Sequence, residues 1–375
     1  MMRYQPLSEF LTEYTLRNDN NQYKPVAVGR YGIRTRDSIY SKELAKDYSK
    51  NKVIYKNTLT VGMGSVQIDI GILTEDIKYS VSPAYHTYEI HDINPTYLRY
   101  CLECRNQDMF TRFVKRGSRQ GKSIDLKRWL TYTIPVFDKQ EQAEIVSVLD
   151  RVSMQISNRH EQLELFEQLV KSRFIELFGD PIDNPKAYPV RKLKTLSRKI
   201  SDGVHAKPQY TETGRPFLSV VNINKGVINF DGCKFVSEEA YQKMIKSTYP
   251  ERGDVLYTKV GATYGIPAYV DTDTEFCLYV SVCLIKPLHE EINSRFLSLS
   301  MGMPYVKRQA DSRIKGIGVP DLHLNQISEF DILCPPRDLQ EQFIAFVEQT
   351  DKSKFLVLKI VKTLFKWSEV LEKMR

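Results

Sequence analysis

The sequence predicts an α+β protein in which two similar mixed α/β domains are joined by two long helices that form an antiparallel coiled coil. Three observations indicate this fold class: two stretches with a heptad pattern, a repeat that relates the two halves, and strand-like and helix-like segments mixed within each half. The expected segments are a first domain at 1–137, a long helix at 138–181, a second domain at 182–336 and a second long helix at 337–375.

The first long helix is predicted over 139–181, because no Gly or Pro occurs there before Gly179 and Pro181. Apolar residues recur at alternating steps of three and four, the pattern of a helix that packs one stripe on a partner. Arg159 and Arg173 occupy two positions of this seam. About 40 residues at ~1.5 Å each make a rod of roughly 60 Å. The apolar positions are Ile145, Leu149, Val152, Ile156, Leu163, Phe166, Val170 and Leu177.

The second long helix has the same spacing from Phe343 onward. Two such helices in one chain, separated by a globular segment, are expected to pair with each other. Similar domains at opposite ends would make that pair antiparallel. The alternatives are that each helix packs on its own domain, or that two chains pair. The predicted seam is Phe343, Phe346, Thr350, Ser353, Val357, Ile360, Leu364, Trp367, Leu371 and Met374.

Matches in the same order relate the two halves. Gln140-Glu-Gln recurs 200 positions later as Gln340-Glu-Gln, and Pro135 and Asp138 recur as Pro335 and Asp338. Asn94-Pro-Thr-Tyr-Leu matches Asn293-Ser-Arg-Phe-Leu at an offset of 199, and Val53-Ile-Tyr resembles Val255-Leu-Tyr. Asn94 is the expected N-cap of a helix that starts at Pro95. The segment 67–73 alternates like a half-buried strand, and 6–16 is expected to form a short helix.

Composition limits the class of protein. The chain of 375 residues has a net charge of +8, which permits a polyanionic partner without proving one. Neither a secretory signal nor an apolar run of about 18 residues is found, so no membrane contact is expected. The six cysteines are scattered, as is typical of reduced thiols in a cytosolic protein, so a cytoplasmic location without metal or cofactor is expected.

At this point the residues resemble a family, the specificity subunits of type I restriction–modification systems. The resemblance rests on a Pro-x-x-x-x-Gln-Glu-Gln motif that opens a long helix twice, after β-rich domains. The first copy departs from the pattern, because Val53-Ile-Tyr-Lys-Asn lacks a preceding Gly-Asp. The segments concerned are Pro135-Val-Phe-Asp-Lys-Gln-Glu-Gln, Pro335-Pro-Arg-Asp-Leu-Gln-Glu-Gln, Phe174-Ile-Glu-Leu-Phe-Gly-Asp-Pro and Arg252-Gly-Asp-Val-Leu-Tyr-Thr-Lys-Val-Gly.

The resemblance implies a non-catalytic subunit that carries two target recognition domains on an antiparallel coiled coil and binds double-stranded DNA. Two modification (methyltransferase) subunits would dock on the helices and methylate adenine. Restriction (helicase-nuclease) subunits would join them and cut DNA after ATP-driven translocation. The target would be two half-sites with a fixed spacer, since a rod of about 60 Å covers close to two turns of B-DNA at ~34–36 Å each.

The sequence contains no complete catalytic motif. Asn94-Pro-Thr-Tyr97 lacks the second Pro of an adenine methyltransferase site, and Gly62-Met-Gly64 is a weak loop signal. The sequence contains no Walker lysine motif, and its histidines are scattered. These observations indicate no catalysis within this chain. The other interpretations are a structural coiled-coil adaptor that binds protein or RNA, and a DNA-cutting enzyme with an unrecognised active site.

Basic and polar residues in exposed loops are the candidates for DNA contact, since Lys and Arg bind phosphates and guanine edges, whereas Asn and Gln suit adenine. One basic loop at the same place in both halves favours this interpretation over solvated surface charge. The candidates are Arg34, Arg36, Lys115, Arg116, Arg119, Lys122, His205, Lys207, Gln209, Tyr210, Lys259, Tyr264, Arg313 and Lys315. The expected partner-docking residues are Gln140, Glu141, Gln142, Gln340, Glu341 and Gln342.

Overall fold

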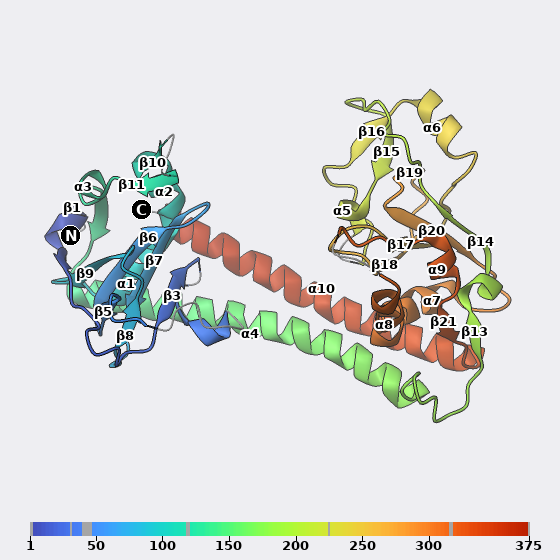
Figure 1. Ribbon diagram of the computed structural model, residues 1–375, viewed down its shortest axis with the longest axis horizontal. Helices are drawn as coiled ribbons and strands as arrows, with labels where there is room; N and C mark the ends of the chain where they lie inside the picture. The colour runs from blue at the N-terminus through green and yellow to red at the C-terminus, as the bar shows by residue number, and fades with distance from the viewer. Residues whose placement is uncertain are drawn as a thin grey trace. The chain divides into compact units, whose positions relative to one another are not determined.

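The computed structural model describes residues 3–30, 32–39, 47–117, 121–223, 226–314 and 318–373, without the side chains of Asp37, Arg116 and 365–373. The chain divides into two compact units (Figure 1). Unit 1 comprises residues 1–159 and 360–375, and unit 2 comprises residues 160–359. Each long helix therefore contributes to both units.

Unit 1 contains a four-stranded antiparallel sheet in the order β2-β9-β6-β7, and α1 and α2 pack against its core. The short helix expected at 6–16 is wrong, because a single 3-10 turn there is followed by strand β2. The elements are β1 (Arg3–Pro6), β2 (Leu11–Tyr14), β3 (Val26–Gly29), β4 (Gly32–Thr35), β5 (Lys52–Ile54), β6 (Thr58–Met63), β7 (Ile68–Leu73), β8 (Tyr79–Val81), β9 (His86–Ile90), α1 (Pro95–Cys104), α2 (Asn106–Phe113), β10 (Val114–Gly117), β11 (Gly121–Ile124), α3 (Leu126–Trp129), β12 (Thr133–Val136) and α4 (Lys139–Phe178).

Unit 2 contains a second four-stranded antiparallel sheet, in the order β14-β20-β17-β18. A smaller sheet, β16-β15-β19, has its own apolar cluster. The elements are β13 (Val190–Lys192), β14 (Ser197–Asp202), β15 (Arg215–Leu218), α5 (Val220–Ile223), β16 (Lys234–Val236), α6 (Glu238–Met244), β17 (Val255–Thr258), β18 (Pro267–Tyr269), β19 (Cys277–Leu278), β20 (Val282–Pro287), α7 (Ser294–Met301), α8 (Pro304–Arg313), α9 (Leu324–Ser328), β21 (Asp331–Leu333) and α10 (Arg337–Lys373).

The predicted repeat is confirmed by the topology of the two units. In each, the strands of the main sheet follow the same spatial order, and a two-stranded pair joins the start of the domain to the strand before the long helix. Helices α1, α2 and α3 recur as α7, α8 and α9. Asn94 and Asn293 are both N-caps, and the side-chain oxygen of each accepts from two backbone N–H groups.

The match of Val53-Ile-Tyr to Val255-Leu-Tyr is wrong. Val53 and Ile54 belong to β5, whereas the counterpart of β17 is β6. Asn57 and Gly253 occupy the equivalent position before these strands: both have positive φ (63° and 96°). The N–H of Asn57 donates to the carbonyl of Leu73 at the end of β7, and the N–H of Gly253 donates to the carbonyl of Val270, the residue after β18. The Gly-Asp that seemed absent from the first half is therefore Asn57-Thr58, because Asn also adopts positive φ at modest cost.

The seam predicted for α4 is confirmed, since all of its positions are half-buried or buried. The helix has 40 residues, and its last turns enter the core of unit 2 through Phe174 and Phe178. These two phenylalanines lie one position beyond the predicted seam residues. The reason is that the end of the helix packs on the body of the domain as well as on α10.

The antiparallel pairing is confirmed within unit 2, where the end of α4 lies beside the beginning of α10 (Figure 1). The rings of Phe174 and Phe343 are 5.5 Å apart. Arg173, which the heptad pattern left unexplained, places its guanidinium 5.5 Å from the ring centre of Phe346 and donates to Glu176. A cation over an aromatic face keeps its charge at the edge of an apolar seam.

The seam predicted for α10 holds for its described side chains with one exception. Val357 is buried, but Ile360 is 43% exposed and Val361 takes its place at 6%. A step of four in place of three fits the ~3.6 residues per turn of an α-helix. Trp367, Leu371 and Met374 lie outside the described side chains.

Candidate nucleic-acid interface

In unit 1, one group of candidates lies on the hairpin β10–β11. Lys115 is exposed and pairs with Asp125 at 2.6 Å, and the pKa of that carboxyl is lowered by the lysine. Lys122 is also exposed, donates to the carbonyl of Ser65 at the tip of β6–β7, and lies 5.4 Å from the ring of Phe110. The side chain of Arg116 and all of Arg119 lie outside the described residues.

The other candidates of unit 1 lie on a different hairpin, β3–β4. Arg34 is exposed on β4, and Arg36 follows in a 3-10 turn with its guanidinium 5.4 Å from the ring of Tyr48. This hairpin packs on β7 and also contacts β6, and strand β11 of the other hairpin contacts β6. The structure thus divides the cations of unit 1 between two hairpins that flank β6 and β7.

In unit 2, the segment 203–214 carries the first group of candidates. His205, Lys207 and Gln209 are exposed, and Tyr210 is half-buried against Phe217, at a ring distance of 5.8 Å. Lys234, which sequence reasoning missed, lies 4.2 Å from the ring of Tyr210 on one side of the group. The signal that points to it is its place at the start of β16, where alternation leaves it exposed before buried Val236.

Lys259 does not present a free charge. Its side chain is 6% exposed and lies 3.6 Å from both Asp202 and Asp321. The adjacent backbone binds the same segment, since the N–H of Leu322 donates to the carbonyl of Lys259. A buried cation between two carboxylates is held in place by the fold. The expectation of a surface contact at Lys259 is therefore corrected: this lysine ties the segment around Asp321 to the sheet.

Tyr264 lies in a compact polar group at the turn before β18. Its hydroxyl donates to Asp311 at 2.5 Å, and the ammonium of Lys307 lies 3.7 Å from its ring centre. Lys307 also pairs with Asp311, and the pKa of this carboxyl is lowered mainly by that lysine. The ring is half-buried, so only part of it is open to a ligand.

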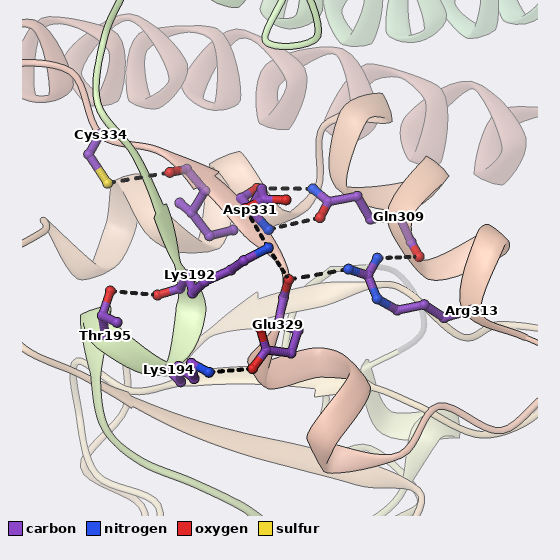
Figure 2. Close-up of polar contacts among 9 residues, drawn as sticks. Lys192, Lys194, Thr195, Gln309, Arg313, Glu329, Asp331 and Cys334 are labelled. Carbon is purple, nitrogen blue, oxygen red and sulfur yellow. Dashed lines mark hydrogen bonds and ion pairs between the residues drawn. The ribbon is translucent and has the colours of Figure 1, made fainter.

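Arg313 is the second candidate that the structure turns inward. Figure 2 shows its guanidinium donating to the carbonyls of Gln309 (2.7 Å) and Glu329 (3.2 Å). It also lies 5.1 Å from the ring of Phe330. Arg313 therefore closes the end of α8 onto the segment before β21; its side chain is half-buried, and its contact with DNA stays a prediction. Lys315 lies outside the described residues.

The Gln-Glu-Gln tripeptides are not simple docking surfaces. Gln142 and Gln340 are buried, at 1% and 2% exposure. Gln140 and Gln342 are exposed. Glu141 bonds to Asp138 within the first turn of α4, and Glu341 pairs with Arg337 on the surface of α10. The two tripeptides thus place their members differently, and the buried side chains of Gln142 and Gln340 are not available to a partner.

The long helices also carry exposed apolar residues away from their seam. On α10, Phe355 is 65% exposed and Leu356 is 60% exposed; on α4, Leu165 is 54% exposed. Apolar residues that form a contiguous exposed patch can mark a site of interaction with another protein, so these residues are candidates for such contact. Among the described residues, no helix is long and apolar enough to cross a membrane, and no cluster of His, Cys, Asp and Glu has metal-binding geometry.

Comparison with known proteins shows what the chain is similar to. Residues 11–167 match the family described as type I restriction modification DNA specificity domain. The MjaIX specificity subunit, from a type I restriction enzyme of Methanocaldococcus jannaschii, is 22% identical over 71% of this chain and 66% of its own length. The MjaVIII specificity subunit of the same organism is 23% identical over 66% of this chain and 60% of its own length. The matches thus span two thirds or less of these relatives.

Solved structures show the same fold. The S subunit of a type I restriction–modification system from M. genitalium superposes with a TM-score of 0.53 at 14% identity, over 99% of this chain and 95% of that chain. A chain from a structural study of type I complex assembly and conformational transition gives 0.54 at 18% identity, over 100% and 95%. In its matched domain and in its fold, the chain is therefore similar to the specificity subunits of type I restriction–modification systems.

Proposed function

We propose that this chain is the DNA-recognition subunit of a type I restriction–modification complex. Residues 1–137 and 182–336 form the two target recognition domains, and the helices at 138–181 and 337–375 join them. Each domain reads one half-site of a two-part target. Modification subunits bound to the helices methylate adenine, restriction subunits join to cut the DNA, and the complex works in the cytoplasm without a catalytic group from this chain.

The observation that carries this proposal is one sheet order used twice with different connecting segments. A repeated framework with unlike loops is what a reader of two unlike half-sites requires, because base readout depends on loop side chains. Exposed cations lie on the segments that connect the main-sheet strands and helices: Arg34, Lys115 and Lys122 in unit 1, and Lys207 and Lys234 in unit 2. Arg36, Arg116, Arg119, His205, Gln209, Tyr210, Tyr264 and Lys315 remain proposed contacts.

The modification subunits are proposed to bind the exposed apolar residues of the long helices. Leu165 and Leu169 on α4, and Phe355 and Leu358 on α10, are available for this contact. Gln140, Glu141, Glu341 and Gln342 remain proposed docking residues at the helix starts. Gln142 and Gln340 leave this set, since their side chains are buried.

The test is reconstitution of the chain with the modification subunits encoded beside its gene. The purified complex methylates a plasmid library, and N6-methyladenine is mapped on both strands by sequencing. The expected result is one motif of two short parts with a constant gap. Replacing residues 182–336 with the same segment of another family member should change one part only. Methylation at a contiguous motif, or a change in both parts, would contradict the proposal.

A further inference from the structure

The first turn of each long helix contains a buried glutamine with the same contacts. In unit 1, the side-chain oxygen of Gln142 accepts from the N–H of Asn94 at 2.8 Å, and its amide nitrogen donates to the carbonyl of Phe137 at 2.8 Å. In unit 2, Gln340 accepts from Asn293 at 2.9 Å and donates to Pro335 at 2.8 Å. Equal geometry at two places in one chain indicates a shared structural task.

These contacts show that the repeat is offset differently from what the tripeptides suggest. Gln142 is equivalent to Gln340, an offset of 198, and helices α4 and α10 begin at the same offset, at Lys139 and Arg337. The tripeptide match pairs Gln142 with Gln342 instead, which is exposed. Each tripeptide thus contains one buried and one exposed glutamine, in opposite order.

Each glutamine joins three elements of its own domain. The strand before the long helix ends close to the carbonyl that receives the amide, at Phe137 or Pro335. The domain helix, α1 or α7, starts at the Asn whose N–H the glutamine accepts, and the same Asn caps that helix with its side chain. Ile145 and Phe343, one turn further on, pack into the domain core. The direction of the long helix is thereby tied to the domain.

We propose that Gln142 and Gln340 are positioning residues, which fix the direction of each recognition domain on its long helix and so set the half-site separation that the protein accepts. Truncation of either glutamine removes the side-chain amide and leaves the backbone N–H and the backbone carbonyl that it bonded without a partner. Because buried polar groups without partners are unfavourable, the truncation loosens this junction specifically. The inference rests on the proposed function for its DNA consequence, whereas the junction itself is a property of the chain.

The experiment compares Gln142→Ala and Gln340→Ala with Gln140→Ala and Gln342→Ala, in which the exposed member of each tripeptide is removed. Spin labels are introduced as unnatural amino acids at exposed Thr111 and Lys246, because native cysteines exclude thiol labelling. Pulsed EPR on the full chain should give a broader distance distribution for the buried-site variants and an unchanged one for the exposed-site variants. Gln142→Met and Gln340→Met, which keep the side-chain volume, repeat the test if alanine prevents folding.

The second measurement uses DNA with the motif mapped for the complex, with its gap unchanged or altered by one base pair. The preference for the correct gap should fall about tenfold in the buried-site variants, the loss expected from roughly one hydrogen-bonded contact. Affinity for a duplex with one half-site should not change, which a general loss of folding would not reproduce. An unchanged distance distribution in every variant overturns the positioning role. If the wild-type complex recognises no two-part motif, the proposed function is overturned. The EPR distances still decide whether the two glutamines position the domains.

Discussion

The two units build the same sheet but use the segments that connect it in different ways. After α2, unit 1 forms the hairpin β10–β11 with exposed Lys115 and Lys122. After α8, unit 2 binds its chain back to the domain, through Arg313 to Glu329 and through the N–H of Gly261 to Pro320. A basic segment at an equivalent place in a repeat therefore need not have an equivalent role. Neighbouring carboxylates and carbonyls decide where each cation points.

A second difference concerns the helix ends. The core of unit 2 contains Phe174 and Phe178 from the end of α4, together with Phe343 and Val347 from α10. In unit 1, Ile145 and Val146 from the start of α4 pack on the core but are only half-buried. Among the described side chains, the core cluster of unit 2 thus contains more residues from the long helices than that of unit 1 does.

The largest expected effect comes from truncating a residue of α4 that is buried in the core of unit 2. Phe174 is 1% exposed, and its ring lies 4.9 Å from that of Phe178 and 5.5 Å from that of Phe343. Phe174→Ala should lower the free energy of unfolding of unit 2 by about 3–5 kcal/mol, since it removes a large ring from a packed core. Denaturant unfolding followed by hydrogen exchange in both units checks this. Ile175→Ala, at a 47% exposed neighbour, is the control; equal loss in both variants contradicts the packing argument.

The next effect tests Lys259, a buried cation of unit 2. Lys259→Met should destabilise unit 2 by roughly 1–3 kcal/mol, because Asp202 and Asp321 lose their shared partner. At the offset of 196 set by Asn57 and Gly253, unit 1 has Met63 in this place. Thermal unfolding of the variant is compared with that of Lys207→Met, at an exposed lysine of the same domain. A Lys259→Met protein as stable as the wild type would return this residue to the set of free DNA contacts.

A smaller effect tests the equivalence of Asn57 and Gly253. Gly253→Ala should cost about 1–2 kcal/mol, because a Cβ is unfavourable at positive φ, whereas Gly253→Asn should cost less. Asn57→Gly should be nearly neutral and Asn57→Ala should be destabilising. Melting temperatures of the four variants measure the order. If alanine and asparagine are tolerated equally at residue 253, the assigned equivalence lacks its conformational basis.

The smallest effect compares the cations of the two units in DNA binding. Lys115→Ala with Lys122→Ala, or Lys207→Ala with Lys234→Ala, should each reduce the slope of log affinity against log salt by about one per lost phosphate contact. The measurement uses the methylated-motif duplex at several salt concentrations. Lys352→Ala, on α10, is the control. A slope that changes as much in the control as in a loop pair would assign the effect to net charge.

Sequence patterns predicted the elements whose signal is local. The heptad steps located both long helices, and Asn94 and Asn293 marked helix starts by their capping chemistry. The alternation at 67–73 identified β7. The expected helix at 6–16 failed because β2 is held by pairing to β9, a contact about 75 residues away that no local propensity reports.

The candidate site was less predictable, since charge in a loop does not reveal burial. Lys259 and Arg313 have the same chemistry as Lys115 and Lys122, and only tertiary contacts with Asp202, Asp321 and Glu329 separate them. The tripeptide match failed for a related reason. Sequence identity makes Gln142 equivalent to Gln342, whereas burial and hydrogen bonds make it equivalent to Gln340.

The offset of 198 has a practical consequence for the construction of hybrid subunits. A hybrid joined at the tripeptide match would follow Gln142 directly with Phe343 and so lack the two residues that separate Gln340 from Phe343. Two residues of α-helix correspond to about 200° of rotation and ~3 Å of rise. The transplanted helix would therefore turn its seam residues toward water and its charged residues toward the domain. Crossover points chosen at Gln142 and Gln340 keep both faces in phase.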